Sequence, residues 1–373
     1  MGLIMLSGFN FHRTATTSVR GLICLASLLL TVSGCVSVGP RAIDATRTDY
    51  NRTLLETEDE QLLLNLVRLR YLDRLLFLEA SALTTQYSFG ASAGAAYGYQ
   101  SRARENSVID GRILVEEKPT VSYTPLQGKD FVERVLSRIS LDTLVLLGSS
   151  GWSVERVYRV CVERVNDIDH AERADGPTPE SQPEYEEFLR LTAVLGKLRE
   201  QDMFSGARTQ EESSAVLRFR NEAGEMEEFQ ELVDLLDLDP ERRVFSLSNS
   251  LDRRDGATLN VRTRSFQGVM YFLSNAVRVP KADIEAGRVT VTRDNEGNIF
   301  DWSGVMDGLM TISTSEEAPD NAAVAVRHRG HWFYIDDSDL DSKSTFAMLG
   351  QIYALQSGSV SIAPPMLTLP VGN

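Results

Sequence analysis

Alternation of apolar and polar residues is the clearest pattern in the first third of the chain. From Tyr87 to Gln100, tyrosine, phenylalanine and alanine occupy every second position, and mostly serine and glycine stand between them. A period of two is typical of a β-strand. Residues 112–124 are expected to return as its partner, with Pro119 at an edge or a break. Residues 77–126 therefore predict a long β-hairpin.

Spacings near 3.6 residues predict helices on both sides of this hairpin. Thr57 and Glu60 form a capping box, which would begin a helix that ends near Leu72. Residues 35–56, between a candidate anchor and this helix, are interpreted as a tether. After the hairpin, apolar spacing predicts further helices over 128–139, 141–148, 152–167 and 184–201.

The second half of the chain has mainly strand composition. The predicted strands are 215–220, 243–247, 258–263, 288–293, 310–314, 322–328 and 331–335. Two helices are predicted among them, over 265–276 and 340–356. Strands mixed with segregated helices favour the α+β class. The polar stretch 202–213 is the predicted boundary between a helix-rich domain with the hairpin (57–205) and an α+β domain (206–373).

The N-terminal region has the features of an export signal. Arg13 and Arg20 lie in a stretch without acidic residues, and an apolar run follows from Gly21 to Val32. The run is about a dozen residues, whereas a membrane-spanning helix needs roughly 20. It ends in Val32-Ser33-Gly34-Cys35. We expect residues 1–34 to be a cleaved signal peptide, with an uncleaved N-terminal anchor as the alternative.

This ending resembles the lipobox of bacterial lipoproteins. The resemblance implies cleavage between Gly34 and Cys35, and a diacylglyceryl thioether plus an N-acyl chain on Cys35. Several acyl chains suffice for stable anchoring, whereas one binds membranes weakly. In that family an Asp after the cysteine retains the protein at the inner membrane. Val36 stands at this position, so the resemblance implies the outer membrane.

Charge narrows the range of binding partners. Removal of residues 1–34 takes away two arginines and no acids, and leaves 36 basic and 53 acidic residues with a net charge of −17. This balance argues against charge-driven binding of nucleic acid or anionic lipid. Besides Cys35, only Cys161 remains, so no internal disulfide can form. Cys161 lies on the apolar face of a predicted helix and is interpreted as a core residue.

The histidines and the acidic cluster do not form a recognisable metal site. His328 and His331 bracket a predicted tight turn, and no H-E-x-x-H pattern accompanies them. Residues 337–341 resemble the opening of a calcium loop, but Ser342 and Met348 stand where Gly and Glu are needed. We expect these acids to cap the following helix. No metal or cofactor is predicted.

Catalytic motifs are also missing from the sequence. Gly148-Ser149-Ser150-Gly151 departs from the G-x-S-x-G elbow, and no phosphate loop or dinucleotide fingerprint is present. Whether the protein is an enzyme therefore stays open, with a non-enzyme favoured. Aromatic residues beside charges favour partner contacts. The candidate partner surface is His331, Trp332, Tyr334, Asp337 and Asp339. The alternative places Trp332 and Tyr334 in a hairpin core.

The alternating segment allows a second functional hypothesis. About 13 residues would be long enough to cross a bilayer, since a transmembrane strand takes about 9–11. One hairpin cannot satisfy its own edges in lipid, so several protomers would have to contribute. The alternative is a long strand in a soluble sheet.

Four segments together carry a wider resemblance. They are residues 60–71 (EQLLLNLVRLRY), 122–128 (SYTPLQG), 150–152 (SGW) and 330–337 (GHWFYIDD). They resemble a family of uncharacterised proteobacterial outer-membrane lipoproteins. The resemblance implies the lipid anchor and a single-unit architecture. The family has no assigned activity, so the resemblance supplies no catalytic or binding residues.

We therefore expect a lipid-anchored envelope protein at the outer membrane, with its body in the periplasm and a non-catalytic structural or assembly role. The membrane, through the lipid, and other envelope proteins are the expected partners. A lipid-anchored periplasmic hydrolase and a subunit of an oligomeric outer-membrane pore are the alternatives.

Overall fold

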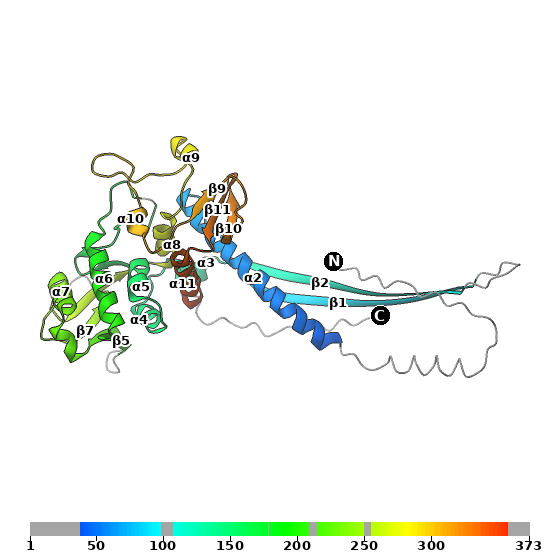
Figure 1. Ribbon diagram of the computed structural model, residues 1–373, viewed down its shortest axis with the longest axis horizontal. Coiled ribbons are helices and arrows are strands. Elements are labelled where there is room, and N and C mark those ends of the chain that lie inside the picture. Colours follow the sequence, from blue (N-terminus) through cyan, green and yellow to red (C-terminus); the bar gives the residue numbers. More distant parts are fainter. Residues whose placement is uncertain (1–37, 98–106, 178, 209–214, 250–254, 357–373) are drawn as a thin grey trace. The chain divides into compact units, whose positions relative to one another are not determined.

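The structure is a computed structural model that describes residues 38–97, 107–177, 179–208, 215–249 and 255–356 (Figure 1). The chain forms two compact units. The hairpin unit comprises Met1–Leu54 and Leu78–Pro125, and the body comprises Leu55–Phe77 and Leu126–Asn373. This division differs from the predicted boundary at 202–213, because the main sheet of the body takes strands from both sides of that segment.

The hairpin unit contains β1 (Leu78–Tyr97) and β2 (Ser107–Pro125), which pair antiparallel. Their register runs from Leu78 opposite Pro125 to Tyr97 opposite Ser107, with one irregularity between Ala80 and Ala82. Figure 1 shows the pair as a long ribbon of two strands. The predicted hairpin is confirmed. Within the described residues neither strand pairs with a third one.

Helix α2 (Val38–Arg70) is much longer than predicted. Its residues up to Leu54 belong to the hairpin unit and the rest to the body. The helix predicted to begin at Thr57 extends back through residues 38–56 of the predicted tether, so Thr57 and Glu60 lie inside the helix rather than at its start. Pro40 does not prevent this, since proline is tolerated in a first helical turn. The predicted apolar side is buried in the body: Leu62, Leu63, Leu66, Val67 and Leu69.

The main sheet of the body has the order β4-β3-β8-β7-β6-β5. Its strands are β3 (Val162–Val165), β4 (Ile168–Asp169), β5 (Phe204–Arg208), β6 (Ala215–Phe219), β7 (Val244–Ser248) and β8 (Thr258–Thr263). Strands β7 and β8 are parallel and the other neighbours are antiparallel. The helix predicted over 152–167 ends at Cys161, because Val162 begins a strand that pairs with β8.

A second sheet has the order β10-β11-β9. Its strands are β9 (Ser313–Ser315), β10 (Ala322–His328) and β11 (His331–Asp336). Arg329 and Gly330 join β10 to β11 with φ angles of 48° and 90°. Positive φ at both central residues is the requirement of a type I′ hairpin turn. The strand predicted over 288–293 is wrong, since only two isolated bridges of Arg293, to Ser181 and to Ile299, are found there.

The remaining elements are helices. They are α3 (Gly128–Phe131), the π-helix η1 (Val132–Leu136), α4 (Leu141–Ser149), α5 (Val154–Cys161), α6 (Glu186–Glu200), the 3₁₀ helix η2 (Asn221–Glu225), α7 (Glu227–Leu236), α8 (Phe266–Ser274), α9 (Lys281–Glu285), α10 (Ser303–Met306) and α11 (Leu340–Gln356). Helices α4, α6, α8 and α11 match the predictions, whereas α7, α9 and α10 were missed. Aromatic rings pack in the core beside the main sheet. The centroid of the Phe219 ring lies 5.2 Å from that of Phe229 and 5.8 Å from that of Phe245. The α+β class is confirmed.

Candidate functional sites

The outer face of the three-stranded sheet carries the two aromatic residues of the predicted partner surface. Trp332 and Tyr334 occupy alternate positions of β11 and are half-buried, whereas Phe333 and Ile335 on the other face are buried. Their cross-strand neighbours are small or charged: Arg327, Ala325, Ser315 and Ser313. Trp332 and Tyr334 therefore share a partly open face, and the partner surface stays a prediction.

The two acids of the predicted surface are engaged at the start of α11. The Asp337 carboxylate forms an ion pair with Lys343, in which Nζ lies 2.5 Å from Oδ1. Asp339 accepts hydrogen bonds from the Ser342 backbone N–H at 3.0 Å and from its hydroxyl at 2.6 Å. The expectation that this acidic segment caps a helix is confirmed. The two acids thus stabilise the helix start and do not join the aromatic pair.

The histidines lie opposite each other at the end of the β10–β11 hairpin. His328 Nε2 lies 3.1 Å from the Asp73 carboxylate, just beyond α2. Arg329 donates to both oxygens of the same carboxylate at 3.0 and 3.2 Å, and its guanidinium lies 5.0 Å from the centre of the Tyr71 ring. The tip of the hairpin is therefore tied to the end of α2 by charge and by ring contacts.

A buried phenol–carboxylate contact continues this cluster. Tyr71 donates its hydroxyl proton to Asp283 Oδ2 at 2.6 Å, and Arg288 contacts the other oxygen at 2.5 Å. Asp283 is only 2% exposed. Burial raises the pKa of Asp283, but the bonds from Tyr71 and Arg288 and the charges of Arg288 and His331 outweigh it and hold the pKa below its ordinary value.

The protonation states of this cluster argue for a structural role. Burial, together with the Asp283 contact, raises the pKa of Tyr71 far above its ordinary value. Burial also lowers the pKa of His328, against the opposing effect of Asp73. At neutral pH the phenol is therefore protonated and the Asp283 carboxylate ionised. General acid–base catalysis needs groups whose pKa values lie near the working pH, and Tyr71 and Asp283 are shifted away from it.

Arg264, between β8 and α8, is the largest fully buried side chain of the body. Its guanidinium donates to four backbone carbonyl oxygens: those of Arg159, Val160, Val162 and His170. It also lies 4.3 Å from the centre of the Phe272 ring. Burial lowers its pKa to about 10, so it keeps its charge at neutral pH. Arg264 thus joins the end of α5, strand β3 and the loop after β4.

Cys161 and His170 lie in the same core. Cys161 is fully buried, and burial raises the pKa of its thiol to about 12, which leaves it unreactive at neutral pH. The expectation of a core cysteine is confirmed. His170 stacks on Phe188 with ring centroids 4.3 Å apart. Burial, and then the charge of Arg264, hold the pKa of His170 well below its ordinary value.

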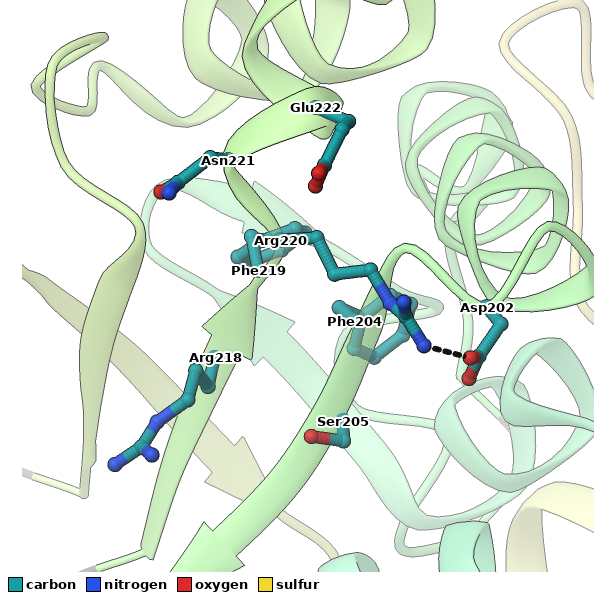
Figure 2. A pocket seen from close by; sticks show the side chains of 8 residues that line it. All are labelled: Asp202, Phe204, Ser205, Arg218, Phe219, Arg220, Asn221 and Glu222. Carbon is teal, nitrogen blue, oxygen red and sulfur yellow. Dashed lines mark hydrogen bonds and ion pairs between the residues drawn. The ribbon is translucent and has the colours of Figure 1, made fainter.

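A cleft of about 390 Å³ lies at the end of β5 and β6, beside η2 (Figure 2). Its lining includes Asp202, Ser205 and Glu222, which are the residue types that a hydrolase would need. Asp202 is already paired with Arg220, as the dashed line in Figure 2 marks. The lining holds no histidine or lysine that could activate Ser205 as a nucleophile. The cleft therefore does not favour the hydrolase alternative.

Neither a metal site nor a membrane-spanning helix is found in the part of the chain that the structure describes. There, no three His, Cys, Asp or Glu side chains come close enough to hold a metal ion. The same residues contain no helix long and apolar enough to cross a membrane. The predicted lipidation and cleavage residues, Cys35 and Gly34, lie outside the described residues.

Sequence reasoning missed both buried polar centres. Arg264 follows a strand and precedes a helix, where an arginine is ordinarily exposed, and no local pattern marks it as buried. Tyr71 and Asp283 are 212 positions apart, so no sequence spacing could join them.

Comparison with known proteins adds no relative. Neither the protein-family models nor the curated proteins nor the solved structures contain a match to this chain.

Proposed function

We propose that this protein is a lipid-anchored envelope protein with a non-catalytic assembly role. It is held at the outer membrane by lipid on Cys35, and its body faces the periplasm. The basic, apolar N-terminal run that ends in Val32-Ser33-Gly34-Cys35 supports export and lipidation. The excess of acidic residues supports attachment through lipid rather than through basic residues, and it argues against a nucleic acid partner.

The hairpin carries the assembly part of this proposal. Strands of 20 and 19 residues are paired with each other, and with no third strand in the described residues. Isolated two-stranded hairpins are at best marginally stable in water, and typical strands have about 5 or 6 residues. Long open edges also invite pairing with another chain. A hairpin of this length is therefore best explained by a further surface that completes it.

The body supports a non-catalytic role. Its two largest buried polar centres are paired internally, since Tyr71 donates to Asp283 and the Arg264 guanidinium donates to backbone carbonyls such as that of Val162. In both centres the shifted pKa values keep one protonation state at neutral pH. These contacts stabilise the fold and present no pair of groups ready to exchange a proton.

Cross-linking in native membranes tests the proposal. A cysteine at Ser122, which is exposed near the base of β2, reports on the hairpin. A cysteine at Glu241, exposed in a loop of the body, is the matched control. The buried Cys161 adds no background, and Cys35 would be blocked by lipid. We expect 4-maleimidobenzophenone, which reacts with the cysteine and on irradiation inserts into a C–H bond of any neighbouring chain, to convert S122C into a discrete product of higher mass and to leave E241C as a single chain.

The composition of that product identifies the partner. A ladder of multiples of this chain means self-assembly, and a product with one other envelope protein means a mixed assembly. If the benzophenone-labelled S122C remains a single chain after irradiation, although its thiol has been fully labelled, the assembly role is wrong.

A further inference from the structure

We propose that the β1–β2 hairpins of several copies join edge to edge and cross the bilayer as the wall of a pore. This inference rests on the proposed assembly role and gives it a physical purpose. In such a pore, each edge and each face of the hairpin is covered. Copies of this chain pair with both edges of the hairpin, lipid acyl chains cover one face, and water covers the other.

The length of the hairpin fits this placement. Tyr87 and Tyr97 stand ten positions apart in β1. At a rise of about 3.3 Å per residue they are about 33 Å apart, and a strand tilt of about 40° reduces this to about 25 Å along the membrane normal. That is the height of the apolar band of transmembrane strands, which is flanked at both interfaces by aromatic residues. The two tyrosines therefore stand where such residues are expected.

The register separates the two faces by polarity. Alternate positions of a strand lie on opposite faces, and directly opposed residues share a face. One face takes these pairs: Tyr87 with Glu117, Phe89 with Val115, Ala91 with Ile113, Ala93 with Gly111, Ala95 with Ile109, and Tyr97 with Ser107. Its single charged position, Glu117, lies at one end, level with Tyr87. This is the face that we assign to lipid.

The opposite face has a different composition. Its pairs are Ser88 with Glu116, Gly90 with Leu114, Ser92 with Arg112, Gly94 with Asp110, and Ala96 with Val108. Charges of both signs, Arg112 and Asp110, thus stand at the middle of the segment on this face alone. Charged residues are strongly unfavourable at the bilayer midplane on a lipid-exposed face and are accepted on a water-filled one. This is the face that we assign to the lumen.

The edges explain why several copies are needed. Each hairpin has two outer edges whose backbone groups find no strand partner in the described residues. Unpaired backbone groups are not tolerated in the hydrocarbon region, so a transmembrane sheet must close on itself. Each copy supplies two strands, and the smallest closed transmembrane sheets have about eight. At least about four copies are therefore required, and a water-filled lumen requires more.

Dye release from vesicles tests the inference with a matched pair of variants. The lipidated full-length protein is added to vesicles of phosphatidylethanolamine and phosphatidylglycerol that contain calcein. Ala91→Arg places a charge on the assigned lipid face, and Ser92→Arg places the same charge on the assigned lumen face one position away. We expect Ala91→Arg to lower release by roughly thirtyfold or more, since the penalty applies in every copy. We expect Ser92→Arg to release dye as the unchanged protein does.

A fluorescence measurement keeps the test independent of folding. An NBD label on a cysteine at position 91 is expected to shift to the blue on addition of vesicles, whereas the label at position 92 is not. Cys161 is buried and does not compete for label. Equal release by both arginine variants, or equal spectra at both positions, would overturn the assignment of faces and with it the pore.

The mass of the complex that contains this protein, measured after extraction from the membrane, distinguishes the pore from the assembly role. A defined oligomer of this chain without dye release overturns the pore and leaves the assembly role intact. A complex with a different envelope protein has the same consequence. A single chain that neither assembles nor releases dye contradicts both proposals.

Discussion

Replacement of Arg264 by methionine is the perturbation that tests the organisation of the body most sharply. Methionine fills a similar volume beside Phe272 but cannot donate a hydrogen bond. The carbonyls of Val162 and His170, which now accept from the guanidinium, would then lose a buried donor. The neighbouring Glu163, only 4% exposed, keeps its contacts with Arg138 and Arg262. The variant therefore removes the donor to the carbonyl cluster and the positive charge that faces Glu163 and Asp175, while the other two ion pairs of Glu163 remain.

The expected magnitude follows from the two closest of these bonds. Hydrogen bonds to charged groups contribute about 1.5–3 kcal/mol each, and removal of a buried charged partner costs about 3–5 kcal/mol. We expect Arg264→Met to lower the free energy of unfolding by about 4 kcal/mol. That is a large part of the roughly 5–15 kcal/mol available to a typical domain. Arg264→Lys keeps the charge but loses the fork geometry, so it should fall between the variant and the unchanged protein.

Urea unfolding followed by circular dichroism measures this effect. The variant should shift the urea concentration of half unfolding and leave the dependence of the free energy on urea unchanged. Arg220→Met is the matched control, since Arg220 forms an ion pair in which both side chains are more than half exposed. Exposed pairs contribute about 0–1 kcal/mol, so this control should be nearly neutral. If the two methionine variants lost equal stability, or if Arg264→Met were neutral, the role assigned to the buried guanidinium would be refuted.

Three further predictions concern the body. Tyr71→Phe removes the donor to buried Asp283 and should cost about 1–3 kcal/mol in urea unfolding, whereas exposed Tyr123→Phe should be neutral; equal losses would contradict the contact. Burial depresses the pKa of His170, so the folded protein keeps this imidazole neutral while the unfolded chain binds a proton as the pH falls. The contribution of His170 to the free energy of unfolding is therefore fully present above pH 6.5. Below that pH it decreases by up to about 1.4 kcal/mol per pH unit. Urea midpoints at pH 7.5 and 5.5 measure this effect. If the midpoint of His170→Leu decreased between these pH values as much as that of the unchanged protein, the prediction would be refuted. Trp302 is 7% exposed, with its indole N–H bonded to Thr292 at 3.1 Å, so Trp302→Ala should cost about 3–5 kcal/mol. Trp332→Ala, on the partly open face, should cost clearly less, and equal costs would place Trp332 in the core.

Local patterns predicted the elements whose structure depends on local contacts. The hairpin strands, α11 and the β10–β11 pair follow from period-two or 3.6-residue spacing and from the turn at Arg329 and Gly330. Capping by Asp339 also depends on residues only three positions apart. In each case the determining interactions lie within one element or across one tight turn.

Elements set by distant contacts were missed. Val162 continues the apolar spacing of α5, yet it forms a strand because β8, about a hundred residues later, supplies its partner. A distant contact also crosses the predicted boundary at 202–213, since β5 within it pairs with β6 in the main sheet. The partners of Arg264 are backbone carbonyls, which are present at every position and leave no trace in a sequence.

The solution mass of the mature chain with Cys35→Ser tests self-assembly through the hairpin most directly. Light scattering in mild detergent would compare the protein that has the full hairpin with a variant in which Asn-Gly replaces residues 84–120. This variant keeps residues 78–83 and 121–125 of the two strands. Urea unfolding confirms that the body of both proteins is folded. The account predicts a defined oligomer for the full hairpin and a monomer for the shortened one. Two monomers of the expected mass would contradict self-assembly through the hairpin, and with it the pore.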